Sequence, residues 1–373
     1  MSPYLRALRL VNFRNYADAT VLLAPGLNII VGENAQGKTN FLEAVSFAVT
    51  GSSPRTPNDP EVVRWGQEFT RAEMRVSLDG GEECKVAVGY APGQKKRLAV
   101  NGALAPSLAA YAAGGAGVRV ITFFPDDIRI VKGAPADRRG FLDGLLSSLR
   151  PTYAHAVTEY ARAVQQRNQL LRRIRDSLSS ERTLSTWDRK VVDLGTAVLK
   201  GRSAAIESLA SLFGDAVRAL YGPEKAALQY FYSAPLEGYA EALREARKYD
   251  IERGITSVGP HRDDFVVLFD EASMTTYGSQ GQQRLMTLAL KFAAREYLRN
   301  ETGQDPVLLF DDVMSELDER RRGYLSEYFL ESTQAVISTT NLEYFDPKIL
   351  EMTRLIRISG GSVHDATRGG AGG

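Results

Sequence analysis

The sequence predicts an α/β fold in which strand-rich segments at both ends of the chain flank a helical middle. Over about the first 130 residues, short segments that are apolar, or that alternate apolar with polar residues, are separated by glycine and aspartate, as is typical of β-strands. Helical spacing of apolar residues follows, and strand-like segments return after about residue 250. We therefore expect a mixed sheet with helices, N-terminal antiparallel strands, and an inserted helical lobe with a short helical hairpin.

The helical middle is expected to fold into this hairpin. Pro151 occupies a favoured first position of a helix. Apolar residues at alternating spacings of four and three run through residues 153–178, interrupted at Arg167, and again through residues 184–209, with Gly201 on the apolar seam. Two such helices would each be about 40 Å long. They either pack into an ordinary bundle or project as a short arm.

Length and composition are those of a soluble globular protein. The 373 residues exceed the usual size of one domain, so we expect two lobes or one large domain with an insertion. The single cysteine, Cys84, excludes an internal disulfide, fits a reducing compartment and is expected in the core on a strand. No segment approaches the roughly 20 apolar residues of a membrane helix, and the N-terminus lacks the apolar core of a signal peptide. We expect a cytoplasmic protein without a membrane partner.

One segment predicts a phosphate-binding loop. Gly32, Gly37, Lys38 and Thr39 match the pattern G-x-x-x-x-G-K-S/T, after an apolar strand and before a helix. Glycines leave backbone N–H groups free to point at phosphate oxygens, and the helix adds its positive N-terminal end. Lys38 would reach the β- and γ-phosphates as a catalytic residue, and Thr39 would be a ligand of Mg²⁺; a glycine-rich structural turn is the alternative. The nucleotide-binding candidates here are Gly32, Glu33, Asn34, Ala35, Gln36, Gly37, Lys38, Thr39 and Asn40.

Paired acids follow a second apolar strand. Residues 307–310 are apolar and are followed by Asp311 and Asp312, and the ends of parallel strands present ligands. We expect Asp311 in the Mg²⁺ shell and Asp312 as the general base that polarises the attacking water; a helix cap or turn is the alternative. The sequence has no N-K-x-D guanine signature, so ATP is favoured over GTP.

A third segment lies between these two. Ser279, Gly281 and Gln282 stand at the start of an apolar helix expected over residues 280–300. They would form a second anion-binding helix end, with a structural helix cap as the alternative.

The order of the three segments is that of ABC-type ATPases, and within that class the chain resembles the RecF family, bacterial recombination mediators of the SMC-like branch. The resemblance covers nearly the whole chain. It is carried by RALRLVNFRNY, GENAQGKTNFLEAV, SPRT at residues 53–56, FFPDDIRIVKGAPADRRGFLD, TSVGPHRDDF, YGSQGQQRLMTLALK and FDDVMSELD. The GPHRDD run is more specific than any generic ATPase motif.

The resemblance implies an ABC-type ATPase head built from both ends of the chain. We expect an ATPase lobe with the phosphate loop at residues 1–135, an inserted helical lobe at residues 136–250 and the rest of the head at residues 251–358. The glycine-rich residues 359–373 are expected to be a mobile tail.

The resemblance further implies an ATP-dependent homodimer. Two copies would sandwich two ATP molecules, with Ser279 and Gly281 of one copy touching the γ-phosphate held by Lys38 of the other, and with Asp318 near the partner's site. The implied partners are gapped duplex DNA and single-strand/double-strand junctions, RecR and RecO, with which such proteins help RecA to load. Two departures from ABC ATPases, FFPDD where a glutamine is usual and Thr340 at the switch-histidine position, predict slow, DNA-stimulated hydrolysis.

DNA contacts are expected from local basic residues, because the net charge is only +1. The candidates on the first hairpin helix are Arg162, Arg167, Arg172, Arg173 and Arg175, although a run of arginines is also typical of a solvated face. Residues 95–97, which end a strand, are a further candidate, and the alternatives are Arg55, Arg138 and Arg139. His261, within GPHRDD, is expected in a buried hydrogen-bond network and not in catalysis.

Two other functions compete with this one. The ATP-binding subunit of an ABC transporter would hydrolyse ATP quickly and bind a membrane partner; the helical insertion, the absent glutamine and GPHRDD disfavour it. A chromosome-scale SMC protein or zinc-hook ATPase is disfavoured by the short helices and by the lack of a C-x-x-C hook.

Overall fold

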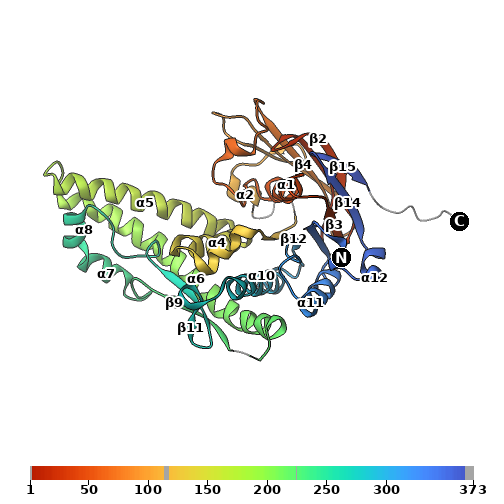
Figure 1. The fold of residues 1–373 in the computed structure, drawn as a ribbon. Helices are drawn as coiled ribbons and strands as arrows, with labels where there is room; N and C mark the ends of the chain where they lie inside the picture. The colour runs from red at the N-terminus through yellow and green to blue at the C-terminus, as the bar shows by residue number, and fades with distance from the viewer. Residues whose placement is uncertain (1, 113–116, 224, 366–373) are drawn as a thin grey trace. The chain divides into compact units, whose positions relative to one another are not determined.

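The computed structural model describes residues 2–112, 117–223 and 225–365. The chain divides into two compact units (Figure 1). The unit that we call the sheet unit comprises Met1–Asp127 and Ala294–Gly373, and the insert unit comprises Ile128–Ala293. This division differs from the inserted lobe expected at residues 136–250, because residues 128–135 and 251–293, with Ser279 among the latter, also belong to the insert unit.

The N-terminal part of the sheet unit forms a six-stranded antiparallel sheet in the order β2-β1-β4-β5-β6-β7. Its strands are β1 (Tyr4–Phe13), β2 (Tyr16–Leu22), β4 (Thr70–Ser77), β5 (Glu83–Tyr90), β6 (Arg97–Val100) and β7 (Ala103–Leu104). Buried and more exposed side chains alternate along most of β4 and β5, so one face packs inward and the other is polar. The N-terminal antiparallel strands are therefore confirmed, as is the buried position of Cys84 on β5.

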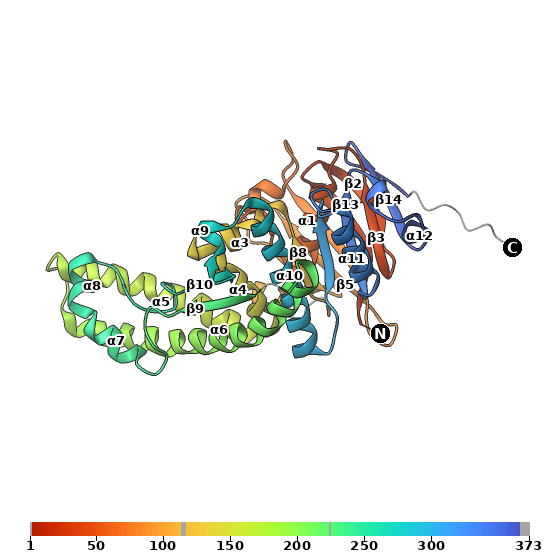
Figure 2. The same cartoon turned by 60° about the horizontal axis from the view of Figure 1, so that its bottom comes forward.

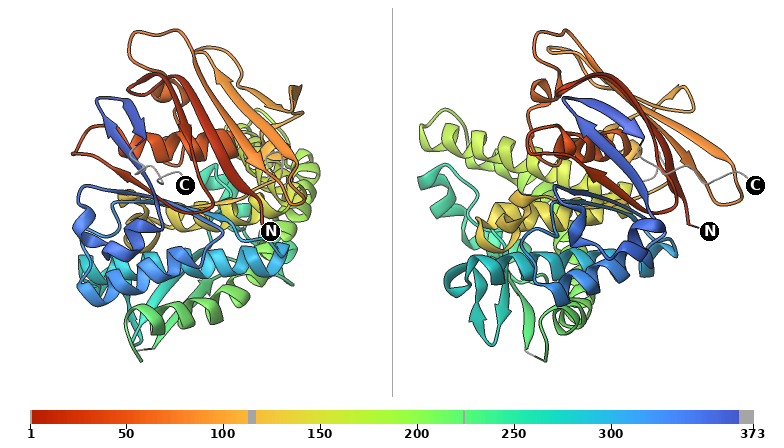
Figure 3. Two further views of the ribbon diagram at one scale, coloured as in Figure 1. Left: turned by 90° about the vertical axis from the view of Figure 1, so that its right-hand side faces the viewer. Right: turned by 45° about the vertical axis from the view of Figure 1, so that its right-hand side comes forward.

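A second six-stranded sheet has the order β15-β14-β3-β13-β12-β8 and is parallel except for β15. Its strands are β3 (Gly26–Val31), β8 (Val120–Phe123), β12 (Val307–Asp311), β13 (Gln334–Thr339), β14 (Arg354–Ser359) and β15 (Ser362–Asp365). Every residue of β12 and β13 is buried, as in parallel strands covered on both faces. Strand β3 lies between two strands from the other end of the chain (Figure 3), so both ends build one sheet.

Helix α1 (Lys38–Thr50) lies between the two sheets (Figure 1). Its apolar side chains share one core cluster with residues of β1, β4 and β5 on one side and of β3, β12 and β13 on the other. A helix covered on both sides has no need of a polar face, which explains the sequence FLEAVSFAV. The other helices of the sheet unit are η1 (Asp59–Val62), α2 (Leu108–Ala112), α11 (Glu319–Leu330), η4 (Leu342–Tyr344) and α12 (Pro347–Glu351), and η2 (Pro125–Ile128) runs to its boundary.

The insert unit contains the predicted helical hairpin, in which α5 (Pro151–Arg175) and α6 (Leu184–Leu220) lie side by side (Figure 2). Pro151 is the first residue of α5, as predicted. The unit also holds α3 (Arg129–Lys132), α4 (Pro135–Leu149), η3 (Glu181–Thr183), α7 (Tyr239–Glu245), α8 (Arg247–Arg253) and α9 (Met274–Tyr277). A small antiparallel sheet joins β9 (Ala226–Phe231), β10 (Asp264–Phe269) and β11 (Ala272–Ser273). Helix α10 (Gln280–Thr302) runs from this unit into the sheet unit.

The C-terminal segment corrects one expectation. Strand β15 pairs with β14, with Val363 opposite Ile358, because Gly360 and Gly361 have φ of 56° and 75° and turn the chain back on itself. The mobile tail expected at residues 359–373 is therefore wrong for residues 359–365. The rest of that segment, residues 366–373, lies outside the described residues.

Candidate functional site

The phosphate loop connects β3 to α1, and close contacts surround both of its glycines. A Cβ atom on Gly32 would lie 2.3 Å from the carbonyl oxygen of Ile358, and one on Gly37 would lie 2.5 Å from the side-chain nitrogen of Asn15. Gly37 also has a φ of 115°, a conformation that L side chains rarely adopt. The hydroxyl of Tyr16 donates to the Gly37 carbonyl at 2.9 Å. The Ile358 backbone therefore requires glycine at position 32, and the left-handed φ together with the Asn15 side chain requires it at position 37.

Lys38 begins α1, and its ammonium group lies against the loop. The residue is only 7% exposed. Its Nζ donates to the carbonyl oxygens of Gly32 at 2.8 Å and of Glu33 at 2.7 Å. Burial lowers the pKa of Lys38, and the charges of Asp312 and Asp311 oppose that shift. Loss of hydration is the largest cause of this pKa shift, so the buried ammonium group lacks the water that would stabilise its charge. An anion bound beside Lys38 would stabilise that charge in place of water.

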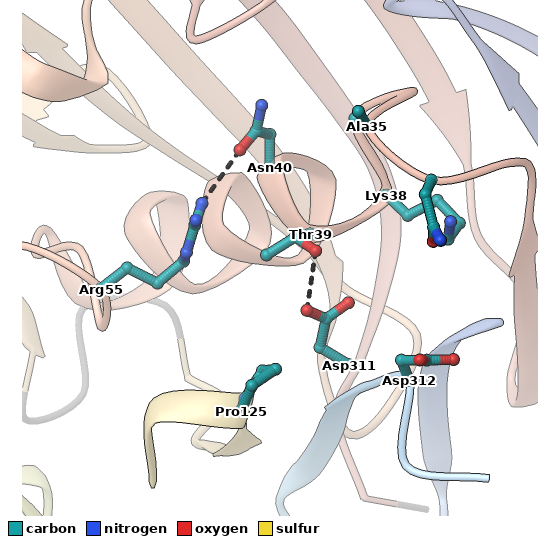
Figure 4. A pocket seen from close by; sticks show the side chains of 10 residues that line it. Ala35, Lys38, Thr39, Asn40, Arg55, Pro125, Asp311 and Asp312 are labelled. Atoms are coloured by element: carbon teal, nitrogen blue, oxygen red, sulfur yellow. Dashed lines mark hydrogen bonds between the residues drawn. The ribbon is translucent and has the colours of Figure 1, made fainter. Parts of the chain in front are cut away.

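Thr39 and Asp311 meet at the end of β12. Thr39 Oγ1 donates to Asp311 Oδ2 at 2.7 Å (Figure 4), and Ser338 Oγ donates to the other carboxylate oxygen at 2.5 Å. A converging hydroxyl and carboxylate are the hard oxygen ligands that Mg²⁺ takes together with phosphate oxygens and water. Among residues 2–112, 117–223 and 225–365, no group of three or more His, Cys, Asp or Glu side chains could hold a metal ion. The Thr39 hydroxyl and the Asp311 carboxylate fit a metal that takes its other ligands from phosphate and water.

Asp312 is turned away from Asp311 by its backbone. Its φ of 46° lies in the left-handed region, which is uncommon for a residue other than glycine. Its N–H donates to Ser338 Oγ at 3.0 Å, and its Oδ2 accepts from the Ser315 hydroxyl at 2.9 Å. Asp312 lies on the Lys38 side of the pocket and Asp311 on the Thr39 side (Figure 4). The two carboxylates are therefore held apart in different surroundings.

These side chains line a pocket of about 350 Å³ in the sheet unit. Its lining residues are Asn34, Ala35, Gly37, Lys38, Thr39, Asn40, Arg55, Pro125, Asp311 and Asp312. Of the nine loop candidates, Gly32, Glu33 and Gln36 are not among them. Two of the lining residues, Arg55 and Pro125, are not among the predicted nucleotide-binding residues. Arg55 Nη1 donates to Asn40 Oδ1 at 3.0 Å and to the buried Glu43 at 2.9 Å. The SPRT segment that contains Arg55 supported the family resemblance but gave no sign of a place at the nucleotide.

The third motif opens α10 in the insert unit. The N–H of Gln282 donates to Ser279 Oγ at 3.2 Å, and the N–H of Ser279 donates to Gln282 Oε1 at 2.9 Å. This reciprocal capping box is the structural helix cap that was the alternative interpretation of Ser279 and Gln282. Ser279 and Gly281 are nevertheless exposed, and the space around a Cβ on Gly281 is open, so an anion can approach this helix end. In the sheet unit, Asp318 caps α11 by accepting the Arg321 N–H at 2.9 Å.

The arginine candidates for DNA contact on α5 separate into exposed and buried residues. Arg162, Arg172, Arg173 and Arg175 are exposed. Arg167 is fully buried, with Nε donating to Asp188 at 2.8 Å and Nη1 to Asp250 at 2.6 Å. The prediction of a DNA contact is wrong for Arg167, because its guanidinium neutralises two carboxylates from α6 and α8 inside the insert unit.

The alternative arginines are also engaged within the protein. Arg138 is 4% exposed and forms two hydrogen bonds, at 2.7 and 2.8 Å, with the Asp264 carboxylate. Arg139 donates to the carbonyl oxygen of Asp263 at 2.7 Å. Burial makes Arg138 unavailable to DNA, whereas Lys95 and Arg97 are exposed. The exposed arginines of α5 and these two residues therefore stay candidates.

The GPHRDD segment forms the predicted hydrogen-bond network. His261 Nε2 lies 2.9 Å from the Thr256 carbonyl oxygen, and since a carbonyl only accepts, Nε2 carries the proton. Nδ1 then accepts from the Tyr160 hydroxyl at 2.7 Å, which lies 3.2 Å from the Tyr239 hydroxyl. Burial lowers the pKa of His261, consistent with a neutral ring. The hydrogen-bond network expected at His261 is confirmed.

The comparisons with known proteins agree with this site. A family model described as an AAA domain matches residues 7–188. The DNA replication and repair protein RecF of Ruminiclostridium cellulolyticum is 34% identical over 368 residues, which cover 96% of this chain and 98% of that protein. A solved structure of the recombination mediator protein RecF with ATP has a TM-score of 0.90 at 31% identity and covers 98% of both chains. The Smc head domain of Pyrococcus furiosus has a TM-score of 0.54 at 16% identity, over 97% of this chain and 95% of that one, which shows a likeness of fold alone.

Fold and site together define an ATPase head of the ABC type. The predicted fold class is thereby confirmed. Because the identity to RecF proteins exceeds 30% over nearly the full length of both chains, the chain belongs to the RecF family. In the part of the chain that the structure describes, no helix combines the length and apolarity needed to cross a membrane.

Proposed function

We propose that this chain is an ATP-dependent, DNA-binding recombination mediator that acts in DNA repair. The observation that carries the proposal is the meeting of Lys38, Thr39 and Asp311 at one pocket in a RecF-family chain, since these are the groups that a triphosphate with Mg²⁺ requires. The related RecF structure described as RecF-ATP, in the RecFOR pathway, supports ATP as the nucleotide.

Each pocket residue has a proposed role. Lys38 binds the β- and γ-phosphates, and backbone N–H groups of the loop bind the remaining phosphate oxygens. Thr39 and Asp311 hold Mg²⁺, which when bound neutralises charge on the transferring phosphoryl group. Asp312 orients a water molecule and takes up its proton. Because FFPDD offers no glutamine and Thr340 stands at the switch-histidine position, hydrolysis is slow.

The exposed tip of α10 supports the proposal of an ATP-dependent homodimer. Ser279 and Gly281 are exposed at the positive end of a long helix, which favours an anion. In the dimer, this tip of one copy contacts the γ-phosphate held by Lys38 of the other, and Asp318 lies near the partner's site. ATP then stabilises the dimer because it binds this closed form more tightly than the separate subunits.

The proposed partners of the dimer are DNA and the other proteins of the pathway. Exposed Arg162, Arg172, Arg173 and Arg175 on α5 bind phosphates of duplex DNA next to a single-stranded gap. With RecR, and with RecO, the protein helps RecA to load there, in the cytoplasm. The RecFOR pathway of the related RecF structure supports this assignment.

Phosphate release and DNA binding test the proposal together. We expect the wild type to hydrolyse ATP far below the typical enzymatic rate of about 10 s⁻¹, and faster with gapped DNA. Lys38→Ala should abolish hydrolysis and ATP-dependent DNA binding, whereas Asp312→Asn should abolish hydrolysis and keep DNA binding. Fast hydrolysis without DNA, or full activity of Lys38→Ala, would contradict the proposal.

A further inference from the structure

The C-terminal hairpin, formed by β14, β15 and the turn at Gly360 and Gly361, contacts the phosphate loop at Gln36. The N–H of Gly360 donates to Gln36 Oε1 at 2.5 Å, and the N–H of Gly361 donates to the Gln36 carbonyl oxygen at 3.2 Å. Asn15 Nδ2 donates to the same carbonyl at 3.1 Å. Both oxygens of Gln36 are therefore engaged with protein groups, and neither Gln36 nor these partners are among the residues that line the pocket.

The same hairpin contacts the other end of the loop. Arg357 of β14 is paired with Val31, the last residue of β3. The carbonyl oxygen of Ile358 lies 2.3 Å from the position of a Cβ on Gly32, so only glycine permits this approach. The loop between these two contacts, at Glu33, Asn34 and Ala35, is exposed.

Asn15 connects this contact to α1. The residue lies in the turn between β1 and β2, and its Oδ1 accepts from Asn40 Nδ2 at 2.9 Å. A Cβ on Gly361 would lie 2.6 Å from the Asn15 carbonyl oxygen. Three segments that are far apart in the sequence thus meet at Gln36 and Asn15: the β1–β2 turn, the phosphate loop and the C-terminal hairpin.

We propose that the C-terminal hairpin positions the phosphate loop for nucleotide, and that Gln36, Asn15 and Gly361 are positioning residues. A phosphate cradle depends on fixed N–H directions, whereas an exposed loop with glycine at both ends has many conformations. Holding both ends of the loop lowers the ordering cost of binding and so tightens it. This inference rests on the proposed nucleotide site and gives Gln36 a different role from phosphate contact.

The test compares two glycines with the same backbone requirement. Gly361 and Gly93 have φ of 75° and 79°; a Cβ on Gly361 would meet Asn15, whereas one on Gly93 meets nothing within 4 Å. Gly361→Ala and Gly93→Ala therefore share the conformational strain but differ in the contact. We expect Gly361→Ala to raise the Kd of a fluorescent ATP analogue about tenfold, the equivalent of one lost positioning contact. Gly93→Ala should leave the Kd at the wild-type value.

Hydrolysis separates positioning from a general structural effect. Gly361→Ala should raise KM for ATP while kcat at saturating ATP is retained, because Lys38, Thr39 and Asp312 are untouched. If Gly361→Ala does not fold, Gln36→Met decides, since it removes the side-chain acceptor of the Gly360 N–H and should raise the Kd with an unchanged unfolding midpoint. If Gln36→Met and folded Gly361→Ala both bind the ATP analogue with wild-type affinity, the positioning role of the hairpin is overturned and the proposed function is kept. No ATP binding by the wild type overturns the proposed function as well.

Discussion

Replacing Arg167 by methionine should strongly destabilise the insert unit. The guanidinium is fully buried and bonded to Asp188, to the fully buried Asp250 and, at 3.0 Å, to Thr256 Oγ1. Methionine fills similar space but leaves the buried Asp250 without its counter-ion, and Asp188 keeps only its ion pair with Arg247. Breaking a buried pair in this way costs about 3–5 kcal/mol. With a typical urea dependence of about 2 kcal/mol per molar, the midpoint of unfolding should fall by about 2 M.

The chain offers a selective probe for this measurement. It contains two tryptophans, Trp65 in the sheet unit and Trp187 on α6 in the insert unit, next to Asp188. In a Trp65→Phe background, the fluorescence of Trp187 during urea unfolding reports the insert unit alone. The matched control is Arg173→Met, because Arg173 lies on α5 like Arg167 but is exposed. This variant should leave the unfolding midpoint unchanged. Arg167→Lys should fall between the two, because lysine keeps the charge but loses the fork of donors.

The result that refutes this reasoning is equally specific. An unchanged Trp187 midpoint in Arg167→Met, with DNA affinity lost, would mean that Arg167 contacts DNA and that its burial has no energetic role.

Three further predictions concern the metal, DNA and pH. Thr39→Val should raise the Mg²⁺ concentration needed for half-maximal binding of the fluorescent ATP analogue by about tenfold or more. Thr50→Val is the control and should leave that concentration unchanged, because Thr50 makes only local hydrogen bonds to backbone at the other end of α1. The double variant Arg172→Ala/Arg173→Ala should bind gapped DNA more weakly than the wild type. The slope of log binding constant against log salt concentration should become less steep by up to about two, because each lost phosphate contact removes about 0.9. An unchanged slope would show that these residues do not contact DNA. Burial lowers the pKa of His261, so below the unfolded pKa of about 6.5 the unfolded chain binds a proton more readily than the folded chain, and the free energy of unfolding should fall as the pH drops. In urea titrations, His261→Asn should lose less stability than the wild type between pH 7 and pH 5. An equal loss in both would exclude His261 as the source of the pH dependence.

The nucleotide pocket was predictable because its chemistry is local. Lys38 and Thr39 are adjacent in one motif, and Asp311 ends a strand whose burial is visible as an apolar run. The hydrogen bond between Thr39 and Asp311 follows from placing both at the same edge of a parallel sheet. The hairpin helices were predictable for a similar reason, since their apolar spacing is regular over many turns.

Arg167 was misassigned because its partners lie far along the chain. Asp188 and Asp250 come from α6 and α8, and no spacing rule connects them to α5. The signal was present, since Arg167 interrupts the apolar seam, and a position on that seam points inward whatever residue fills it. A charge pattern should therefore be read only after the helix face is known.

The C-terminal hairpin and Arg55 escaped prediction because their meaning is tertiary. A glycine-rich segment at the end of a chain usually lacks partners, yet β14 supplies the hydrogen bonds that make Ser362–Asp365 a strand. Arg55 lines the pocket because Glu43 and Asn40, both on α1, hold its side chain there. Neither relation is visible in the sequence around these residues.

The central claim is that ATP, bound at Lys38 of one subunit, is also contacted by the exposed tip of α10 from another. Sedimentation velocity measures this most directly, with ADP or ATP, with and without gapped DNA, for the wild type, Asp312→Asn and Ser279→Arg. The account predicts monomers with ADP, dimers with ATP that persist in Asp312→Asn, and monomers in Ser279→Arg although this variant still binds ATP. Monomers of wild type and Asp312→Asn in saturating ATP, with and without DNA, would contradict it.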